Sequence, residues 1–362
     1  MTELKLQKVG KTFGDFKALQ ELDLEIRSGE LISLLGPSGC GKTTTLRLIS
    51  GLDIPSEGRI YFNGEDVADR AVQARNVGMV FQRYALFPHM NVEQNVSFGL
   101  RVRKTQKDEI KQRVDEILNI VQLTEFRHRF PAQLSGGQMQ RVALARTLIT
   151  NPSILMMDEP LANLDANLRI ELRSFIRNLQ QKLGITTIFV THDQIEAMEL
   201  SDRIAVMLSG RIAQFDTPAN IYHRPASLEV ARFIGAPNIF TGRLLINGSK
   251  VSLETSYGLL SLTDTGGRND GEIVDAMIRP EAVVLTNTDA DGPNVMSGRI
   301  VSSDFFGQAT SYVVKLNGTT LRVDEMSNRR MPVGELVQVN LISENIWIFP
   351  DEPITENAAE NE

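Results

Sequence analysis

The chain has 362 residues, of which 42% are hydrophobic and 23% are charged, and its formal net charge is −7. These values allow two or three globular domains and argue against a nucleic-acid-binding protein, which would favour a basic face. No apolar stretch approaches about 18 residues, so we expect no membrane-spanning helix, and residues 1–10 lack the apolar core of a signal peptide. The single cysteine excludes an internal disulfide and fits a reducing compartment.

The first element with clear chemistry is a glycine-rich loop at residues 36–43, with the sequence GPSGCGKT. It fits the pattern G-x-x-x-x-G-K-[ST], and its flanks predict a buried strand over 31–35 and an amphipathic helix over 43–50. Glycines let main-chain N–H groups converge on a phosphate, and the start of a helix attracts the same anion. Lys42 is expected at the β- and γ-phosphates and Thr43 at Mg²⁺. The candidate nucleotide-binding residues are Gly36, Pro37, Ser38, Gly39, Cys40, Gly41, Lys42, Thr43 and Thr44, with the Cys40 side chain interpreted as a structural filler.

Gln82 ends a strand predicted over residues 77–81, and its amide is placed to reach both Mg²⁺ and an attacking water. The segment that follows interrupts the strand order, as an inserted helical subdomain over about 83–150 would, with a helix expected over 107–122. Some of its apolar side chains pack inside this insert and others are candidates for a docking surface: Tyr84, Leu86 and Phe87.

A second glycine-rich element, LSGGQ at residues 134–138, precedes a helix predicted over 138–150. Ser135 lies near the start of that helix, where exposed N–H groups attract an anion such as a γ-phosphate. The alternative is an ordinary capped helix after a tight turn. One phosphate-binding loop is enough for one nucleotide, so the economical explanation is that the second completes a nucleotide site held by another copy of the chain.

Two further strands end in polar side chains. The apolar run 154–157 leads into Asp158 and Glu159, and the β-branched run 185–191 leads into His192. Asp158 suits a hold on Mg²⁺ beside Thr43, and Glu159 suits polarisation of an attacking water. His192 is a candidate γ-phosphate contact that orients this water, although a lone histidine or an acidic pair also occurs by chance.

The last third of the chain changes character. A hairpin is predicted over 203–215, two short helices over 218–223 and 227–234, and a boundary follows at Gly235. Several short strands over 239–350, with turns at Asn247-Gly248 and Asn317-Gly318, predict a small β-barrel. The candidate strands are 241–246, 250–255, 298–303, 310–316, 319–323, 336–341 and 346–349. Few aromatic residues and little positive charge argue against an oligonucleotide-binding barrel. The tail 351–362 is acidic and low in apolar residues, so we expect it to be disordered.

Together these motifs resemble those of the nucleotide-binding subunits of ATP-binding-cassette (ABC) transporters, nearly continuously over residues 3–235. In this family's terms 36–43 match the Walker A motif, Gln82 the Q-loop, 134–138 the signature sequence, 154–158 the Walker B strand, Glu159 the catalytic base, 162–165 the D-loop and His192 the switch histidine. The resemblance assigns catalysis to Glu159, His192 and Gln82, and Mg²⁺ to Thr43, Gln82 and Asp158. It adds these nucleotide contacts: Phe13, Ser135, Gly136, Gly137, Gln138 and Asp165.

Two of these positions qualify the resemblance. Phe13 falls where the family usually has an aromatic ring that stacks on adenine, although an ordinary core position is the alternative. The D-loop of close relatives usually begins with serine, and here Ala162 takes that place, so a hydroxyl that would bond across a dimer is missing.

The resemblance implies an α/β P-loop NTPase (ABC ATPase) domain over 1–235, followed by an all-β, OB-like TOBE barrel over 236–350 that includes the segment Ile278-Arg279-Pro280-Glu281. It implies an ATPase that uses ATP and Mg²⁺ to energise a binding-protein-dependent importer of a small polar solute, with a polyamine or ferric iron as first candidates. Sugar, phosphonate and sulfate importers are alternatives, as is a soluble regulatory ABC ATPase. The implied partners are a second copy of the chain, two integral-membrane permease subunits and an extracytoplasmic solute-binding protein, at the cytoplasmic face of the cell membrane and without nucleic acid.

Overall fold

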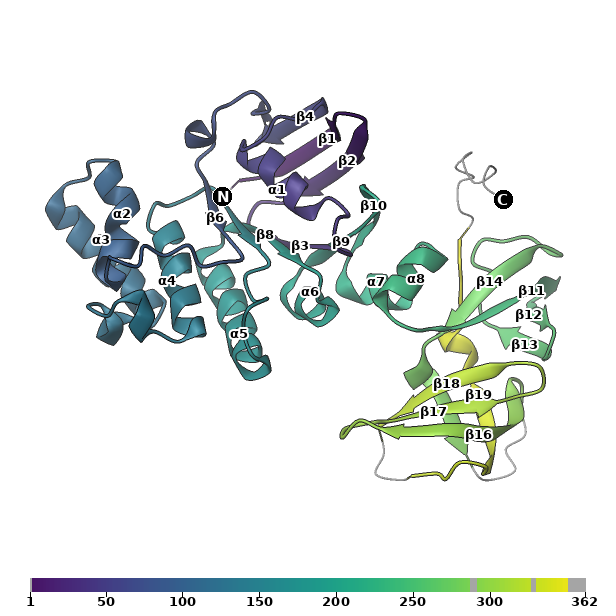
Figure 1. Cartoon of the computed structure of the whole chain (residues 1–362). Coiled ribbons are helices and arrows are strands. Elements are labelled where there is room, and N and C mark those ends of the chain that lie inside the picture. The colour runs from purple at the N-terminus through teal and green to yellow at the C-terminus, as the bar shows by residue number, and fades with distance from the viewer. Residues whose placement is uncertain (1, 287–291, 327–329, 351–362) are drawn as a thin grey trace. The chain divides into compact units, whose positions relative to one another are not determined.

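The computed structural model describes residues 2–286, 292–326 and 330–350 and divides into two compact units, Met1–Pro218 and Ala219–Glu362 (Figure 1). The acidic tail 351–362, which was expected to be disordered, lies outside the described residues. The boundary predicted at Gly235 falls after the two short helices, whereas the compact units divide between Pro218 and Ala219. Within the described part, no helix is both long and apolar enough to cross a membrane.

The first unit begins with an antiparallel sheet that was not predicted from the sequence. Its strand order is β2 (Phe16–Ile26), β1 (Leu4–Phe13), β4 (Glu57–Phe62) and β5 (Glu65–Asp66). Side chains of β1 and β2 alternate between buried and exposed, and the buried set includes Leu4, Leu6 and Leu24. This is the pattern of a sheet with one face on the core.

The second sheet of this unit carries the loops with candidate chemistry. Its order is β10 (Arg211–Asp216), β9 (Arg203–Leu208), β3 (Leu31–Leu35), β8 (Thr186–Thr191), β7 (Ile154–Asp158) and β6 (Val77–Val80). All neighbours are parallel except β9 and β10, which form the predicted hairpin. Strands β3 and β8 are buried along their whole length, which is typical of a parallel sheet covered on both faces. The strands predicted over 31–35, 77–81, 154–158 and 185–191 are confirmed to within a residue at their ends.

Helices of the first unit follow these strands. They are α1 (Lys42–Ser50), α5 (Ala166–Leu183) and α6 (Gln194–Leu200), with a helical segment made of α2 (Val92–Val102), α3 (Lys107–Ile120) and α4 (Gly136–Leu148). Short 3-10 turns lie at Val72–Ala74, Thr124–Phe126 and Pro131–Gln133. The helical segment has an apolar core that includes Val96, Leu118 and Leu144, and Tyr84 and Leu86 pack against it. The range predicted as a helical insert thus contains three α-helices, and its standing as a separate subdomain stays a prediction.

A buried arginine fixes the end of α1. Arg75 is 3% exposed and donates to the main-chain oxygens of Leu48 at 2.7 Å and Ile49 at 2.9 Å. It also donates to the main-chain oxygens of Ala68 at 2.7 Å and Arg70 at 3.0 Å. The last carbonyls of a helix lack partners inside the helix, so Arg75 supplies a donor to Ile49 and adds to the bond that Leu48 accepts from the N–H of Gly51. Burial lowers the pKa of Arg75.

The second unit contains α7 (Pro218–His223, whose first residue ends the first unit), α8 (Leu228–Ile234) and two antiparallel sheets. One sheet has the order β13 (Gly258–Leu262), β12 (Lys250–Thr255), β11 (Asn238–Asn247), β14 (Ile273–Ile278), β20 (Trp347–Ile348). The other has the order β15 (Val283–Thr286), β19 (Leu336–Leu341), β16 (Val295–Phe305), β17 (Thr310–Lys315), β18 (Thr320–Glu325). Short 3-10 turns lie at Pro280–Ala282 and Ser343–Asn345. Both sheets share one core around Phe240, Ile300 and Tyr312, so the predicted OB-like β domain is confirmed.

Arg279, in the segment that resembles a TOBE motif, attaches the two short helices to this β domain. It is 4% exposed and donates to the main-chain oxygens of Tyr222 at 2.7 and 3.1 Å and of Ala231 at 3.3 Å. The Tyr222 hydroxyl in turn donates to Glu281 at 2.6 Å, and burial together with this carboxylate raises the pKa of Tyr222 to about 12. These contacts explain why α8 belongs with the second compact unit.

Candidate active site

The glycine-rich loop between β3 and α1 has a shape that only glycine permits. Gly41 has a φ of +103°, and a Cβ there would lie 2.3 Å from the Leu19 side chain. A Cβ on Gly36 would lie 2.3 Å from the main-chain oxygen of Met207, whereas the space beside Gly39 is open. The loop is therefore packed against the sheet on one side and accessible on the other, as a phosphate cradle requires.

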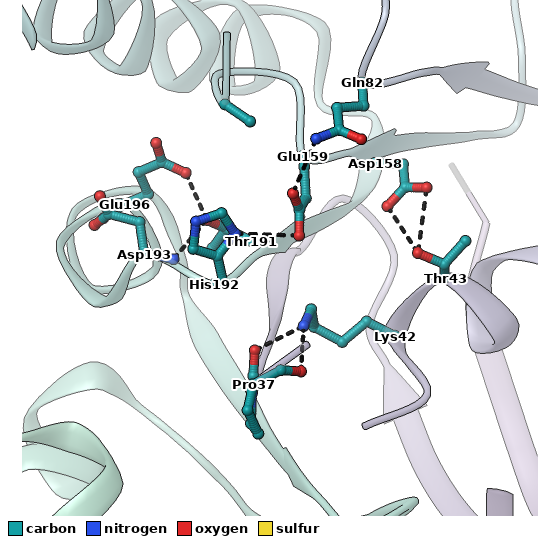
Figure 2. Close-up of polar contacts among 12 residues, drawn as sticks. Pro37, Lys42, Thr43, Gln82, Asp158, Glu159, Thr191, His192, Asp193 and Glu196 are labelled. Carbon is teal, nitrogen blue, oxygen red and sulfur yellow. Dashed lines mark hydrogen bonds and ion pairs between the residues drawn. The ribbon is translucent and has the colours of Figure 1, made fainter. Parts of the chain in front are cut away.

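Lys42 follows this loop with its ammonium group turned back onto it. Its Nζ donates to the main-chain oxygens of Gly36 at 2.6 Å and Pro37 at 2.9 Å, and the residue is 6% exposed (Figure 2). Cys40 is 4% exposed and its thiol packs in the core of the unit, where burial raises its pKa. These contacts agree with the interpretation of the Cys40 side chain as a filler, so its main chain is the part available to a ligand.

Thr43 and Asp158 place oxygen atoms side by side at the edge of the sheet. The Thr43 hydroxyl lies 3.3 Å from Oδ1 and 3.4 Å from Oδ2 of Asp158 (Figure 2). Burial raises the pKa of Asp158, with a smaller contribution in the same direction from Glu159. Among the described residues, no group of three or more His, Cys, Asp or Glu side chains is placed to hold a metal. Mg²⁺ is usually held by one or two protein oxygens together with phosphates and waters, so this pair fits such an ion.

The three residues predicted to act in catalysis meet at Glu159. The Gln82 side-chain nitrogen donates to Oε2 of Glu159 at 3.3 Å, and Nδ1 of His192 lies 3.2 Å from Oε1 (Figure 2). Glu159 has a φ of +42°, a strained conformation for a residue other than glycine, and its N–H donates to the main-chain oxygen of Val190 at 3.0 Å. This turn directs the carboxylate from the end of β7 toward the end of β8.

The segment after β8 is fixed by a small polar network. The Thr191 hydroxyl donates to Glu196 at 2.6 Å and accepts from the N–H of Asp193 at 2.9 Å (Figure 2). Asp193 caps α6 by accepting from the N–H groups of Ile195 and Glu196. Burial raises the pKa of Glu196, which is 4% exposed. His192 is thereby attached to a rigid helix start.

The second glycine-rich element forms a regular helix start. Ser135 caps α4 by accepting from the N–H of Gln138 at 3.3 Å, and the Gln138 side chain accepts from the N–H of Ser135 at 2.9 Å. Residues 134–138 and 36–43 are all described, and no hydrogen bond or ion pair joins the two elements. The structure therefore does not bring this predicted nucleotide contact to the first loop of the same chain.

Two predicted contacts lie at the margin of this site. Phe13, at the end of β1, is 48% exposed, so the alternative of an ordinary core position is wrong. Lys11, which forms an ion pair with Asp53 at 2.6 Å, holds its ammonium 4.9 Å from the centre of the Phe13 ring. Asp165 caps α5 by accepting from the N–H of Leu168 at 3.0 Å. The nucleotide contacts assigned to Phe13 and Asp165 stay predictions.

Sequence reasoning missed three residues that support this site. Asn163 donates to the main-chain oxygen of Gln82 at 3.0 Å, Glu196 holds Thr191, and Arg169 contacts both the loop after Glu159 and Asp193. The spacing of Asp193 and Glu196 matches a capped helix start and was a usable signal. The sequence carried no signal for the contacts of Asn163 and Arg169, because each residue contacts segments that only the fold brings near it.

Comparisons with known proteins agree with these observations. The ABC transporter family model matches residues 19–162, and a TOBE domain model matches residues 276–349. The chain is 45% identical over 353 residues to a Fe(3+) ions import ATP-binding protein of Fusobacterium nucleatum subsp. nucleatum, covering 96% of this chain and 94% of that protein. It is 42% identical over 365 residues to a spermidine/putrescine import ATP-binding protein of Marinobacter nauticus, covering 97% and 96%. A solved dimeric ATP-binding cassette bound to ADP and Pi in a post-hydrolysis state matches 59% of this chain and 98% of its own, with a TM-score of 0.53 and 33% identity.

Proposed function

Because this chain belongs to the ATP-binding import proteins of the ABC transporter family, we propose that it hydrolyses ATP to drive uptake of ferric iron or a polyamine through a membrane permease. The family is one of ATPases, so ATP is the substrate of the site. The observation that carries the proposal is the meeting of Glu159 with His192 and Gln82 beside the Thr43–Asp158 pair.

The glycine-rich loop and Lys42 bind the phosphates of ATP. The Lys42 ammonium already donates to two loop carbonyls, so phosphate oxygens replace weak neutral acceptors with charged ones. Thr43 and Asp158 would hold Mg²⁺, with Gln82 as a further oxygen ligand, and the chemistry that the ion would supply is neutralisation of charge on the phosphates. Phe13 offers its exposed ring to the adenine.

Glu159 polarises the attacking water. Its Oε1 is held by His192 and its Oε2 by Gln82, so the carboxylate has a fixed orientation before the water arrives. His192 also contacts the γ-phosphate and keeps the water in line with it. Protein groups thus supply orientation and electrostatic stabilisation, which dominate catalysis of phosphoryl transfer.

The signature element completes the ATP site of a second copy. The start of its helix comprises Ser135, Gly136, Gly137 and Gln138. These residues form no hydrogen bond or ion pair with the phosphate-binding residues of their own chain. A head-to-tail dimer brings it against the γ-phosphate held by the partner, and Asp165 of the D-loop lies at the same junction. Loss of the γ-phosphate after hydrolysis then opens the dimer.

The importer requires further chains. We place the dimer at the cytoplasmic face of the cell membrane, on two integral-membrane permease subunits that receive solute from an extracytoplasmic binding protein. The proposal rests on the names of the relatives; Tyr84 and Leu86 pack against the core of the helical segment, so docking there would use only their exposed parts.

Uptake assays test the proposal. Cells that lack the gene are compared for uptake of radiolabelled ferric iron and radiolabelled putrescine, with plasmids that carry the wild-type gene or the Lys42→Ala variant. We expect loss of uptake of one solute, restored by the wild type and not by Lys42→Ala, because that variant lacks the phosphate-binding cation. Unchanged uptake of both solutes would contradict the assignment of the cargo, and ATPase activity of Lys42→Ala equal to wild type would contradict the site.

A further inference from the structure

Glu159 is followed by the D-loop, and its partner His192 lies in the segment after β8. The side chain of Arg169 contacts both of these segments. Arg169 lies in the first turn of α5, and its Nε donates to the main-chain oxygen of Leu164 at 3.0 Å. Its Nη2 donates to the main-chain oxygen of Ala162 at 3.3 Å. Both acceptors belong to the D-loop.

The third nitrogen of the same guanidinium faces the other segment. Nη1 of Arg169 lies 4.0 Å from Oδ2 of Asp193, which directly follows His192. Asp193 is fixed in turn, because its other carboxylate oxygen caps α6 and its N–H donates to the Thr191 hydroxyl (Figure 2). The planar fork of arginine holds its donors in a fixed geometry on three separate nitrogens, whereas the three donors of lysine radiate from one nitrogen.

These contacts close a ring around the candidate base. The N–H of Ala162 donates to the main-chain oxygen of Glu159 at 3.3 Å, Arg169 links Ala162 to Asp193, and His192 returns to the Glu159 carboxylate at 3.2 Å. A cavity of about 10 Å³, roughly the space of one water, lies inside this ring. Its lining residues are Glu159, Ala162, Arg169, Thr191, His192, Asp193 and Glu196.

We propose that Arg169 is a positioning residue, which holds the D-loop and the switch-histidine segment at the separation that Glu159 and His192 need for hydrolysis. The inference rests on the proposed ATPase function of this site. It assigns Arg169 no contact with ATP. Ala162 makes the contact with Arg169 more important. The usual serine hydroxyl is missing at this position, and Arg169 binds the main-chain oxygen of Ala162 instead. Without Arg169, both segments stay attached to their strands but lose the side chain that links them. The Glu159 carboxylate and the His192 imidazole are then expected to move apart.

The test compares purified full-length variants in ATP hydrolysis and in equilibrium ATP binding. Arg169→Gln is expected to lower kcat at least about tenfold, because small misplacements of catalytic groups have effects of this size, while the Kd for ATP stays within about twofold. Arg177→Gln is the matched control: Arg177 lies on the same helix, is similarly half-buried, and pairs with Asp202 away from the site, so its kcat stays within about twofold.

A double-mutant cycle separates positioning from general stability. Asp193→Asn keeps the helix cap, since asparagine caps as well as aspartate, but removes the charge that faces Arg169. The kcat losses of Arg169→Gln and Asp193→Asn are expected to be non-additive, because both break the same link. If Arg169→Gln does not fold, Arg169→Lys is measured in its place. This variant keeps the positive charge but is expected to lose one of the two hydrogen bonds to D-loop carbonyls.

Three results would overturn the inference: a wild-type kcat in Arg169→Gln, a loss matched by Arg177→Gln, or kcat losses in the cycle that are additive. Glu159→Gln separates this failure from failure of the proposed function. If Glu159→Gln loses hydrolysis and Arg169→Gln does not, the positioning role alone is wrong. If both variants hydrolyse ATP like the wild type, the site itself is wrong.

Discussion

Replacing Glu159 by glutamine is the most direct test of the active site. The side chain keeps its shape, but its amide can accept through one oxygen only, whereas the carboxylate contacts His192 at 3.2 Å and Gln82 at 3.3 Å through two. One of these neighbours therefore faces an N–H group instead of an acceptor. The variant also loses the negative charge that we propose polarises the attacking water. A general base contributes about 100- to 10,000-fold, so we expect kcat to fall at least about 100-fold, or about 2.7 kcal/mol of barrier.

Binding of ATP is expected to survive this change, because the glycine-rich loop, Lys42 and Thr43 are untouched. Removal of a carboxylate near the phosphates leaves affinity equal or higher, and the variant should accumulate as an ATP-bound dimer. Phosphate release measures kcat, and size-exclusion chromatography with and without ATP measures the dimer. Glu125→Gln, at an exposed carboxylate of a 3-10 turn, is the control and should behave as the wild type. Hydrolysis at the wild-type rate by Glu159→Gln would refute the reasoning.

Three other substitutions test separate parts of the structure. Asp158→Asn should lower Mg²⁺-dependent hydrolysis at least about tenfold yet raise the thermal stability of the ligand-free chain at pH 7. Burial raises the folded-state pKa of the Asp158 carboxyl, so its ionisation destabilises the fold as pH rises through that pKa. The difference in melting temperature between Asp158→Asn and the wild type should therefore vanish as pH falls toward about 4. Ser135→Ala removes the cap on Gln138 and should cost about 1 kcal/mol, with ATP binding intact and hydrolysis lost; unchanged hydrolysis would argue against the signature role. Arg75→Met removes four hydrogen bonds to main-chain carbonyls, including the one to Ile49 at the end of α1, and should cost about 3 kcal/mol in urea unfolding; a loss below about 1 kcal/mol would contradict that account.

The parts of the fold that the sequence predicted best are those with a local signal. Strands β3, β7 and β8 are short and largely buried, and each ends at or next to a residue that the sequence predicted for the site. The loop at 36–43 was predicted in full, because its glycines are required by main-chain geometry at this place. Family resemblance added the roles of the signature and D-loop elements.

Other parts had weaker signals. The antiparallel sheet of β1, β2 and β4 was missed although its apolar residues alternate, since its register contains several bulges that break the period of two. Strands β13, β14 and β15 were also missed, and the strand expected over 346–349 is a 3-10 turn followed by a two-residue strand. The contacts of Arg169 and Asn163 are unreadable from sequence, because they depend on how loops from different strands meet.

The two glycine-rich elements differ in what their own chain already provides. The loop at 36–43 has Lys42, Thr43 and Asp158 around it and, across the sheet edge, Glu159 with its two partners. The element at 134–138 has a capped helix start, and no hydrogen bond or ion pair joins it to the loop at 36–43. A complete reaction centre needs positive groups on both sides of the γ-phosphate, because charge develops there during transfer. In the proposed function, the chain supplies one side to its own nucleotide and the signature helix start supplies the other to a second copy.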